Sequence, residues 1–319
     1  MGTFDMPMTE LIHYGGRTPC PQNFDSYWTD ALRQLADIPP SWELVPANIS
    51  FPQAECYDLY FTGVGGSRIH AKFLRPSHTG TRMPAVLQFH GYGCSAGDWW
   101  DKLPFVQCGF AVAAMDCRGQ YGLSEDRGGV RGNTQYGHII RGLFDSPDKL
   151  LFRQIFLDTV RLAEILSAMP EIDATRLHAL GGSQGGGLAL ACAALYPQVR
   201  SAVVMYPFLS DYRRVWEMDL ARDSYKEITD YFRAYDPIHR NEDMIFENLG
   251  YIDVQHLTRR IQGNVLWGIG MMDTICPPSA QFAAYNKLTS HKRMCIYPDF
   301  GHEPLPGFMD EALSFMLQF

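Results

Sequence analysis

The sequence predicts one α/β domain with a mostly parallel central sheet flanked by helices. Three observations support this prediction. Short apolar runs alternate with helix-like segments along most of the chain. Two early strand-like runs are joined by a Gly-Gly-Ser turn at 65–67, which indicates an antiparallel start. Further along, a serine stands at the apex of a glycine-rich turn between an apolar run and an Ala/Leu-rich run.

The predicted elements follow in chain order within a single domain, 1–319. Residues 1–40 form an N-terminal extension with one amphipathic helix at 24–35, ended by two prolines. Strand-like runs lie at 42–47, 56–64, 69–74, 84–90, 110–116, 176–180, 202–206, 264–272 and 293–297. Helical spacing marks the segments 152–167, 188–195 and 309–317. The polar, helix-like segment 207–262 interrupts the sheet pattern, and we expect it to be an insertion over the active site.

Composition narrows the class of protein. The 319 residues are 46% apolar and 19% charged, with a formal net charge of −8, which is typical of a globular protein. The negative charge argues against nucleic acid or an anionic membrane as a partner. Eight cysteines show no C-x-x-C spacing, and no signal peptide or apolar run of about 18 residues is present. We expect a cytoplasmic protein with reduced thiols, no metal and no cofactor.

The glycine-rich turn carries the strongest chemical signal. Ser183 lies in the run Gly-Gly-Ser-Gln-Gly-Gly-Gly at 181–187, between the strand-like run and the helix-like run. A serine in a G-x-S-x-G turn between a strand and a helix is the nucleophile elbow of α/β-hydrolases. Glycines are needed there because side chains would collide with neighbouring elements. An ordinary flexible loop is the alternative, but such loops seldom run from a buried strand into an Ala/Leu helix. The sequence therefore predicts an α/β-hydrolase fold.

A nucleophilic serine needs a base and an orienting acid, which follow it in the order acid, then histidine. Asp273 stands at the carboxyl end of the predicted strand 264–272. Its alternative role is to cap a helix that begins near Pro277, and the two roles are compatible.

Two histidines lie beyond this acid. His291 precedes the last predicted strand, whereas His302 follows it, at the sheet edge where α/β sites lie. We therefore predict His302 as the base. Asp299 is too close to His302 in sequence to be the better orienting acid. His70, His90 and His178 lie in or beside strands and are expected to be structural.

The transition state of acyl transfer needs two N–H donors for its oxyanion. One is expected from the backbone of Gln184, directly after the serine, and the other from Tyr92 in the loop His-Gly-Tyr-Gly at 90–93. Bulky residues near this site predict a small acyl pocket, formed by Pro207, Phe208 and Trp100 together with Tyr92.

Three short signatures narrow the prediction further: Arg-Gly-Gln at 118–120, Gly-Gly-Ser-Gln-Gly-Gly at 181–186 and His-Glu at 302–303. In this order and spacing the chain resembles the acetyl xylan esterase/cephalosporin-C deacetylase family, carbohydrate esterase family seven. The resemblance covers nearly the whole chain, including the stretches 152–158, 206–209, 273–279 and 282–286.

The resemblance implies Ser183, Asp273 and His302 as the triad, with Tyr92 and Gln184 as oxyanion donors. It also implies removal of acetyl groups from xylo-oligosaccharides and other small acetylated molecules, without metal or cofactor. Family members tend to be cytoplasmic homohexamers, trimers of dimers, whose active sites face an interior cavity.

The resemblance also marks Arg118, Gln120 and Glu303 as supporting residues. No acyl-transfer role follows for Arg118 or Glu303, so we expect either surface residues or a supporting ion pair between them. Tyr121 stands where the family often has glycine, which affects the expected loop conformation and the substrate rim, but not the triad.

Two other functions compete with this reading. A general short-chain carboxylesterase or an acyl-peptidase-like hydrolase would use the same triad, although the peptidase would normally carry a propeller domain for which the chain has no room. A non-catalytic binding protein of the same fold would usually lack a triad residue, and here all three are present in order.

Overall fold

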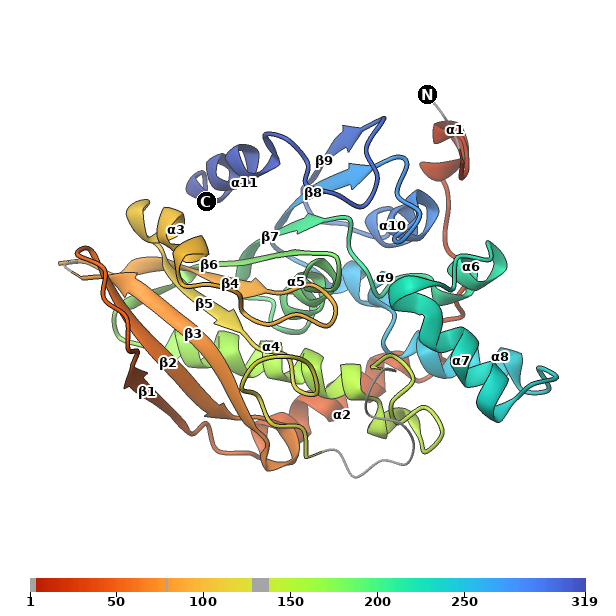
Figure 1. The fold of residues 1–319 in the computed structure, drawn as a ribbon, viewed down its shortest axis with the longest axis horizontal. Coiled ribbons are helices and arrows are strands. Elements are labelled where there is room, and N and C mark those ends of the chain that lie inside the picture. Colours follow the sequence, from red (N-terminus) through yellow and green to blue (C-terminus); the bar gives the residue numbers. More distant parts are fainter. Residues whose placement is uncertain (1–3, 78–79, 128–137) are drawn as a thin grey trace.

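The computed structural model describes residues 4–77, 80–127 and 138–319. Within these residues nine strands form one sheet in the order β1-β2-β3-β5-β4-β6-β7-β8-β9 (Figure 1). The pairs from β1 to β3, and β3 with β5, are antiparallel, whereas every pairing from β5 to β9 is parallel. The predicted α/β class, with an antiparallel start and a mostly parallel sheet, is confirmed.

The strands agree with the sequence prediction to within a few residues at each end. Their bounds are β1 (Trp42–Pro46), β2 (Ala54–Thr62), β3 (Arg68–Pro76), β4 (Met83–Phe89), β5 (Ala111–Met115), β6 (Ile172–Gly182), β7 (Val199–Met205), β8 (Asn264–Gly270) and β9 (Lys292–Tyr297). The largest difference is at β6, which begins four residues before the predicted run 176–180 because it pairs with β4 as early as Met83 and Ile172.

Helices cover both faces of the sheet and form two apolar layers. One face packs against α4 (Leu151–Ala168), α5 (Gln184–Leu195) and α10 (Pro278–Tyr285), and α2 (Phe24–Ala36) packs on the outside of α4. The other face packs against α3 (Leu103–Gln107) and α11 (Phe308–Leu317). Helix α5 is buried along its whole length, as its Ala, Leu and Gly composition requires. The serine turn that precedes α5 is therefore held by a rigid core element.

The segment between β7 and β8 is helical, as predicted. It contains α6 (Tyr212–Glu217), α7 (Lys226–Tyr235), α8 (Glu242–Gly250) and α9 (Val254–Leu257). These helices lie beyond the carboxyl ends of the parallel strands (Figure 1). None of the helices in the described ranges is long and apolar enough to cross a membrane.

Asp211 of this insertion holds three groups of the N-terminal extension, beside other contacts such as the ion pair between Arg17 and Glu217. Besides the predicted helix α2, the extension has a short helix α1 (Met8–Leu11). Between the two, the hydroxyl of Tyr14 donates to Asp211 Oδ2 at 2.8 Å, and the N–H groups of Arg17 and Thr18 donate to Asp211 Oδ1 at 2.7 and 2.8 Å. Asp211 in turn donates its own N–H to Asp253 Oδ2 at 2.9 Å. The first residues of the chain thus form part of the support for the insertion.

Candidate active site

The turn between β6 and α5 has the strained geometry that its glycines predict. Ser183 has φ 55° and ψ −122°, and its N–H donates to the carbonyl oxygen of Met205 at 2.9 Å. A Cβ on Gly185 would lie 2.0 Å from the carbonyl oxygen of Phe89, and a Cβ on Gly181 would lie 2.2 Å from the Gly185 backbone. Only glycine fits at these two positions. The turn is therefore a tight elbow that holds the serine at the end of the sheet.

The structure brings the three predicted triad residues together. His302 Nε2 lies 3.1 Å from the hydroxyl oxygen of Ser183, and His302 Nδ1 lies 2.8 Å from Asp273 Oδ2. Asp273 is fully buried. Its second oxygen, Oδ1, accepts hydrogen bonds from the N–H groups of Ile275 and Cys276 at 2.9 and 2.8 Å. Asp273 therefore braces its own turn and faces the histidine at the same time.

The competing residues lie elsewhere. Helix α10 begins at Pro278 without a side-chain cap, so Asp273 does not cap it. His291 and Asp299 are both exposed, at opposite ends of β9. His178 is buried and bonds to Ser201 Oγ at 2.8 Å, in agreement with the expected structural role.

Two residues that the sequence reasoning missed lie directly against the triad. The ring of Tyr206, which follows β7, lies 4.5 Å from the His302 ring. Burial, and then the charge of Asp273, raise the pKa of its hydroxyl. Cys276 is buried, its thiol interacts with Ser183, and burial followed by the charge of Asp273 raises its pKa. The signal for Tyr206 was its position at the carboxyl end of a parallel strand.

The described residues also include one set of candidate metal ligands at this place. Asp273, Cys276 and His302 each place one ligand atom within 4.8 Å of the others. Asp273 and His302 are hydrogen-bonded to each other, with the buried carboxylate on one nitrogen and the serine on the other. This arrangement suits proton transfer to and from Ser183 better than metal ligation.

The loop after β4 faces the elbow and is tied to it by two glutamines. Gln120 accepts a hydrogen bond from the N–H of Gly93 at 2.9 Å. The amide groups of Gln120 and Gln184 bond to each other in both directions, at 2.7 and 3.0 Å. Gln120 thus joins the loop to the residue that follows the serine, which gives the third residue of the Arg-Gly-Gln signature a clear positioning role.

Asp116 and His90 link the same loop to the residues that follow β5. Asp116 accepts from the N–H of Ala96 at 2.7 Å and bonds to His70 Nδ1 at 2.6 Å. Burial opposes the ionisation of Asp116, but the hydrogen bonds from His70 and from peptide groups hold its pKa below the usual value. His90 Nε2 accepts from the N–H of Cys117 at 3.0 Å. His70 and His90 are structural, as the sequence analysis expected.

The residues predicted for the acyl pocket differ in burial. Phe208 is fully buried, with its ring 5.7 Å from that of Tyr92 and 4.4 Å from that of Tyr225. Pro207 is buried beside it, against the elbow at Gly186. Trp100, in contrast, is 72% exposed. Phe208 and Pro207 therefore back the site, and Trp100 does not enclose it in this chain.

Of the two alternatives for Arg118 and Glu303, an ion pair between them is wrong, and a surface position holds for Glu303 alone. Arg118 is buried and forms a two-pronged pair with Asp158 at 2.7 and 2.6 Å. Glu303 is exposed and accepts from the N–H of Gly301 at 2.9 Å. Arg118 follows β5 and Glu303 follows β9, which lie five strand positions apart, about 24 Å at ordinary strand spacing. Arg118 supports the fold beneath the Gln120 loop.

The unusual residue after Gln120 leaves that loop intact. Tyr121 is 76% exposed. The next residue, Gly122, has φ 110°, and a Cβ there would lie 2.3 Å from the carboxyl carbon of Asp116. The position that requires glycine is therefore Gly122.

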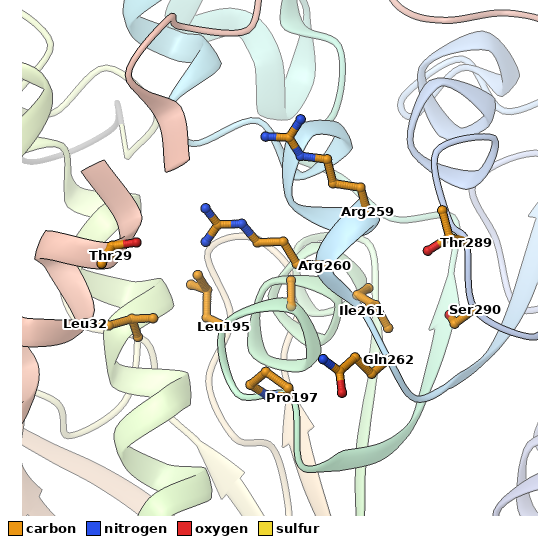
Figure 2. A pocket seen from close by; sticks show the side chains of 11 residues that line it. Thr29, Leu32, Leu195, Pro197, Arg259, Arg260, Ile261, Gln262, Thr289 and Ser290 are labelled. Atoms are coloured by element: carbon orange, nitrogen blue, oxygen red, sulfur yellow. The ribbon is translucent and has the colours of Figure 1, made fainter. Parts of the chain in front are cut away.

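A separate surface hollow lies between α2, the end of α5 and the loop before β9 (Figure 2). Two guanidinium groups reach across it from the 3-10 turn Thr258–Arg260. Arg259 and Arg260 both bond to the carboxylate of Asp25, at 2.8 and 2.5 Å. Their charge is thus partly neutralised within the chain, and the hollow contains none of the triad residues.

The chain was compared with known protein families and solved structures. The model of the acetyl xylan esterase family AXE1 matches residues 1–319. The chain is similar to acetyl xylan esterase 1 from Thermoanaerobacterium sp. JW/SL YS485, with 56% identity over 99% of both chains and a TM-score of 0.97. It is also similar to the acetyl xylan esterase from Paenibacillus sp. R4, with 32% identity, 98% of this chain and 100% of that chain covered, and a TM-score of 0.94.

Two more distant proteins are similar in sequence or in fold. The chain is 26% identical over 290 residues to acetyl esterase Axe7A of Xylanibacter ruminicola, which covers 88% of this chain and 63% of the relative's length. An α/β-hydrolase from Penicillium sp. sh18 shares the fold, at 15% identity over 82% of this chain and 95% of that one, with a TM-score of 0.54. The chain therefore has an α/β-hydrolase fold and belongs to the acetyl xylan esterase family.

Proposed function

We propose that the protein is a serine esterase that removes acetyl groups from small acetylated substrates such as xylo-oligosaccharides and cephalosporin C. The observation that carries this proposal is the hydrogen-bonded series from Ser183 through His302 to the buried Asp273. The 56% identity to an acetyl xylan esterase supports the choice of an acetyl ester as substrate.

In the proposed reaction, the hydroxyl oxygen of Ser183 attacks the acetyl carbonyl carbon while His302 Nε2 takes the hydroxyl proton. Asp273 holds the Nδ1–H of the imidazole and stabilises its positive charge. The N–H groups of Tyr92 and Gln184 stabilise the oxyanion. His302 then returns the proton to the departing sugar alcohol, and a water molecule, activated by the same histidine, releases acetate from Ser183.

The preference for a short acyl group follows from the packed aromatic rings at the site, of which Phe208 is fully buried. Tyr206 lies against His302, and Phe208 lies behind Tyr92. A longer acyl chain would have to displace these packed rings, which lowers the rate about 10- to 200-fold. A general short-chain carboxylesterase remains the alternative.

The test compares kcat/KM for p-nitrophenyl acetate, butyrate and octanoate, then for acetylated xylobiose, cephalosporin C and acetylated xylan. We expect acetate to exceed octanoate by at least about tenfold, and oligosaccharides to exceed the polymer. Octanoate hydrolysed as fast as acetate would contradict the small acyl pocket.

The family resemblance also supports a cytoplasmic homohexamer, a trimer of dimers with enclosed sites. Light scattering after size-exclusion chromatography tests the assembly, and a monomer would contradict it. Rapid deacetylation of intact polymer would count against enclosed sites.

A further inference from the structure

We propose that Glu227, on α7 of the insertion, is a positioning residue that fixes the oxyanion loop through the hydroxyl of Tyr92. The inference rests on the proposed function, in which the N–H of Tyr92 is an oxyanion donor. It assigns a catalytic consequence to a residue that lies 135 positions from Tyr92 in sequence.

The carboxyl group of Glu227 is surrounded by donors. One oxygen, Oε1, accepts from the hydroxyl of Tyr92. The other, Oε2, accepts from the N–H groups of Ile139 and Ile140 at 2.5 and 3.1 Å. The residue is 3% exposed. Burial raises the pKa of Glu227 to about 8, although the hydrogen bonds oppose that shift. A buried acidic group is unfavourable unless its hydrogen bonds are satisfied, so this one has a defined geometry.

Tyr92 transmits this geometry to the loop. Its ring is held between Phe208 and His138, at centroid distances of 5.7 and 5.1 Å. With the ring packed and the hydroxyl bonded, contacts hold the side chain at both its ring and its tip, and so restrain the Cα of the residue whose N–H is the proposed oxyanion donor.

The backbone on either side of Tyr92 needs such an anchor. Its neighbours, Gly91 and Gly93, are glycines, which restrict the chain least, and Gly93 has φ 64°. On one side the N–H of Gly93 is held by Gln120 at 2.9 Å. The Tyr92 hydroxyl on Glu227 supplies a second, independent point. The peptide that contains the Tyr92 N–H is also held at its carbonyl oxygen, Gly91 O, which lies 2.8 Å from His90 Nδ1 and accepts from the N–H of Cys94 at 3.2 Å. The bond to Glu227 adds the contact that ties this loop to the insertion.

The main variant is Tyr92→Phe, which removes one hydroxyl and keeps the packed ring. We expect kcat and kcat/KM for p-nitrophenyl acetate to fall together by about tenfold, because a displaced donor stabilises the transition state less than a fixed one. KM should change less than about twofold. Glu227→Leu should have the same effect on kcat, and the double variant should be no worse than either single variant.

Conservative and matched controls separate positioning from stability. Glu227→Gln should retain most activity, because its amide oxygen accepts from the two peptide groups while its NH₂ donates to the Tyr92 oxygen. Tyr225→Phe removes another buried hydroxyl, bonded to the carbonyl oxygen of Ser210 at 3.2 Å, from a ring packed on the same Phe208. It should lower the melting temperature and leave kcat unchanged.

Each outcome decides the question. If Tyr92→Phe keeps kcat within about twofold of the parent, or if the two single effects add in the double variant, Glu227 does not position the loop. If Glu227→Leu fails to fold, Tyr92→Phe and Glu227→Gln decide. Ser183→Ala is measured beside them: an active Ser183→Ala enzyme would instead remove the proposed function on which the inference rests.

Discussion

The serine elbow and the loop that faces it are held in place by different kinds of contact. Each triad residue follows its own strand: the N–H of Ser183 donates to the adjacent strand β7 at Met205, and Asp273 bonds to the N–H groups two and three residues on. The loop at 90–98 has local contacts too: the carbonyl oxygen of Gly91 accepts from the N–H of Cys94 at 3.2 Å, and the ammonium group of Lys102 donates to the carbonyl oxygens of Ala96 and Asp98. It depends in addition on three long-range anchors, Gln120, Asp116 and Glu227, which lie 27, 20 and 135 residues away from the groups they hold.

This difference separates two tasks. The reacting groups stand at the strand ends. The long-range anchors position the N–H groups that are proposed to bind the carbonyl oxygen of the substrate. Loss of a reacting group should therefore abolish turnover, whereas loss of an anchor should only reduce it. The following variants test that ranking, from the largest expected effect to the smallest.

Ser183→Ala should reduce kcat/KM for p-nitrophenyl acetate by at least about 10⁴-fold, since removal of a triad nucleophile eliminates the acyl-enzyme route. The protein should remain folded, because little buried volume is lost, and thermal melting checks this. Activity within about tenfold of the parent would place the nucleophile elsewhere.

Asp273→Asn should lower kcat by about 10³- to 10⁴-fold, because the amide favours the wrong imidazole tautomer. The matched control is Asp299→Asn, an exposed acid near the same histidine, which should change kcat less than about twofold. The opposite ranking would make Asp299 the orienting acid.

Arg118→Met should lower the free energy of unfolding by about 3–5 kcal/mol, because it leaves the buried carboxylate of Asp158 without its partner. Replacing both residues, with Arg118→Met and Asp158→Leu, should recover much of this loss. Urea unfolding measures both. If Arg118→Met leaves the free energy of unfolding unchanged, the pair is not needed for stability. The control Glu303→Gln should not change the free energy of unfolding.

Gln120→Ala should lower kcat by about tenfold, with a small change in KM, because the loop loses its link to Gln184 while every reacting group remains. Steady-state kinetics with p-nitrophenyl acetate measure this. A loss as large as that of Ser183→Ala would show that anchors and reacting groups cannot be separated.

Tyr121→Gly should have the smallest effect. The residue is 76% exposed, so the free energy of unfolding should change by less than about 0.5 kcal/mol and kcat should stay near that of the parent. A large change in KM for acetylated xylobiose alone would identify Tyr121 as part of the substrate rim.

The same contrast explains how far sequence reasoning reached. Strand ends, the elbow and the positions of Asp273 and His302 follow from local patterns, and the structure brings those residues together. The partner of Arg118 did not follow, because it depends on the strand order in the sheet, which places β5 five positions from β9, and on the packing of β5 against α4. The roles of Gln120 and Glu227 also depend on which loops meet in space, and no local pattern contains that information.

The Asp211 contact has a consequence for the kinetics of folding. Its donors, Tyr14, Arg17 and Thr18, are 193 to 197 residues upstream, so during synthesis they are exposed long before their acceptor exists. Closing so long a loop has a large entropic penalty unless the intervening sheet has already formed. The contact should therefore form after the folding transition state, and its stabilisation should appear as slower unfolding rather than faster folding. The contacts of the N-terminal segment with Asp211 should thus be the last to form during folding and the first to break during unfolding.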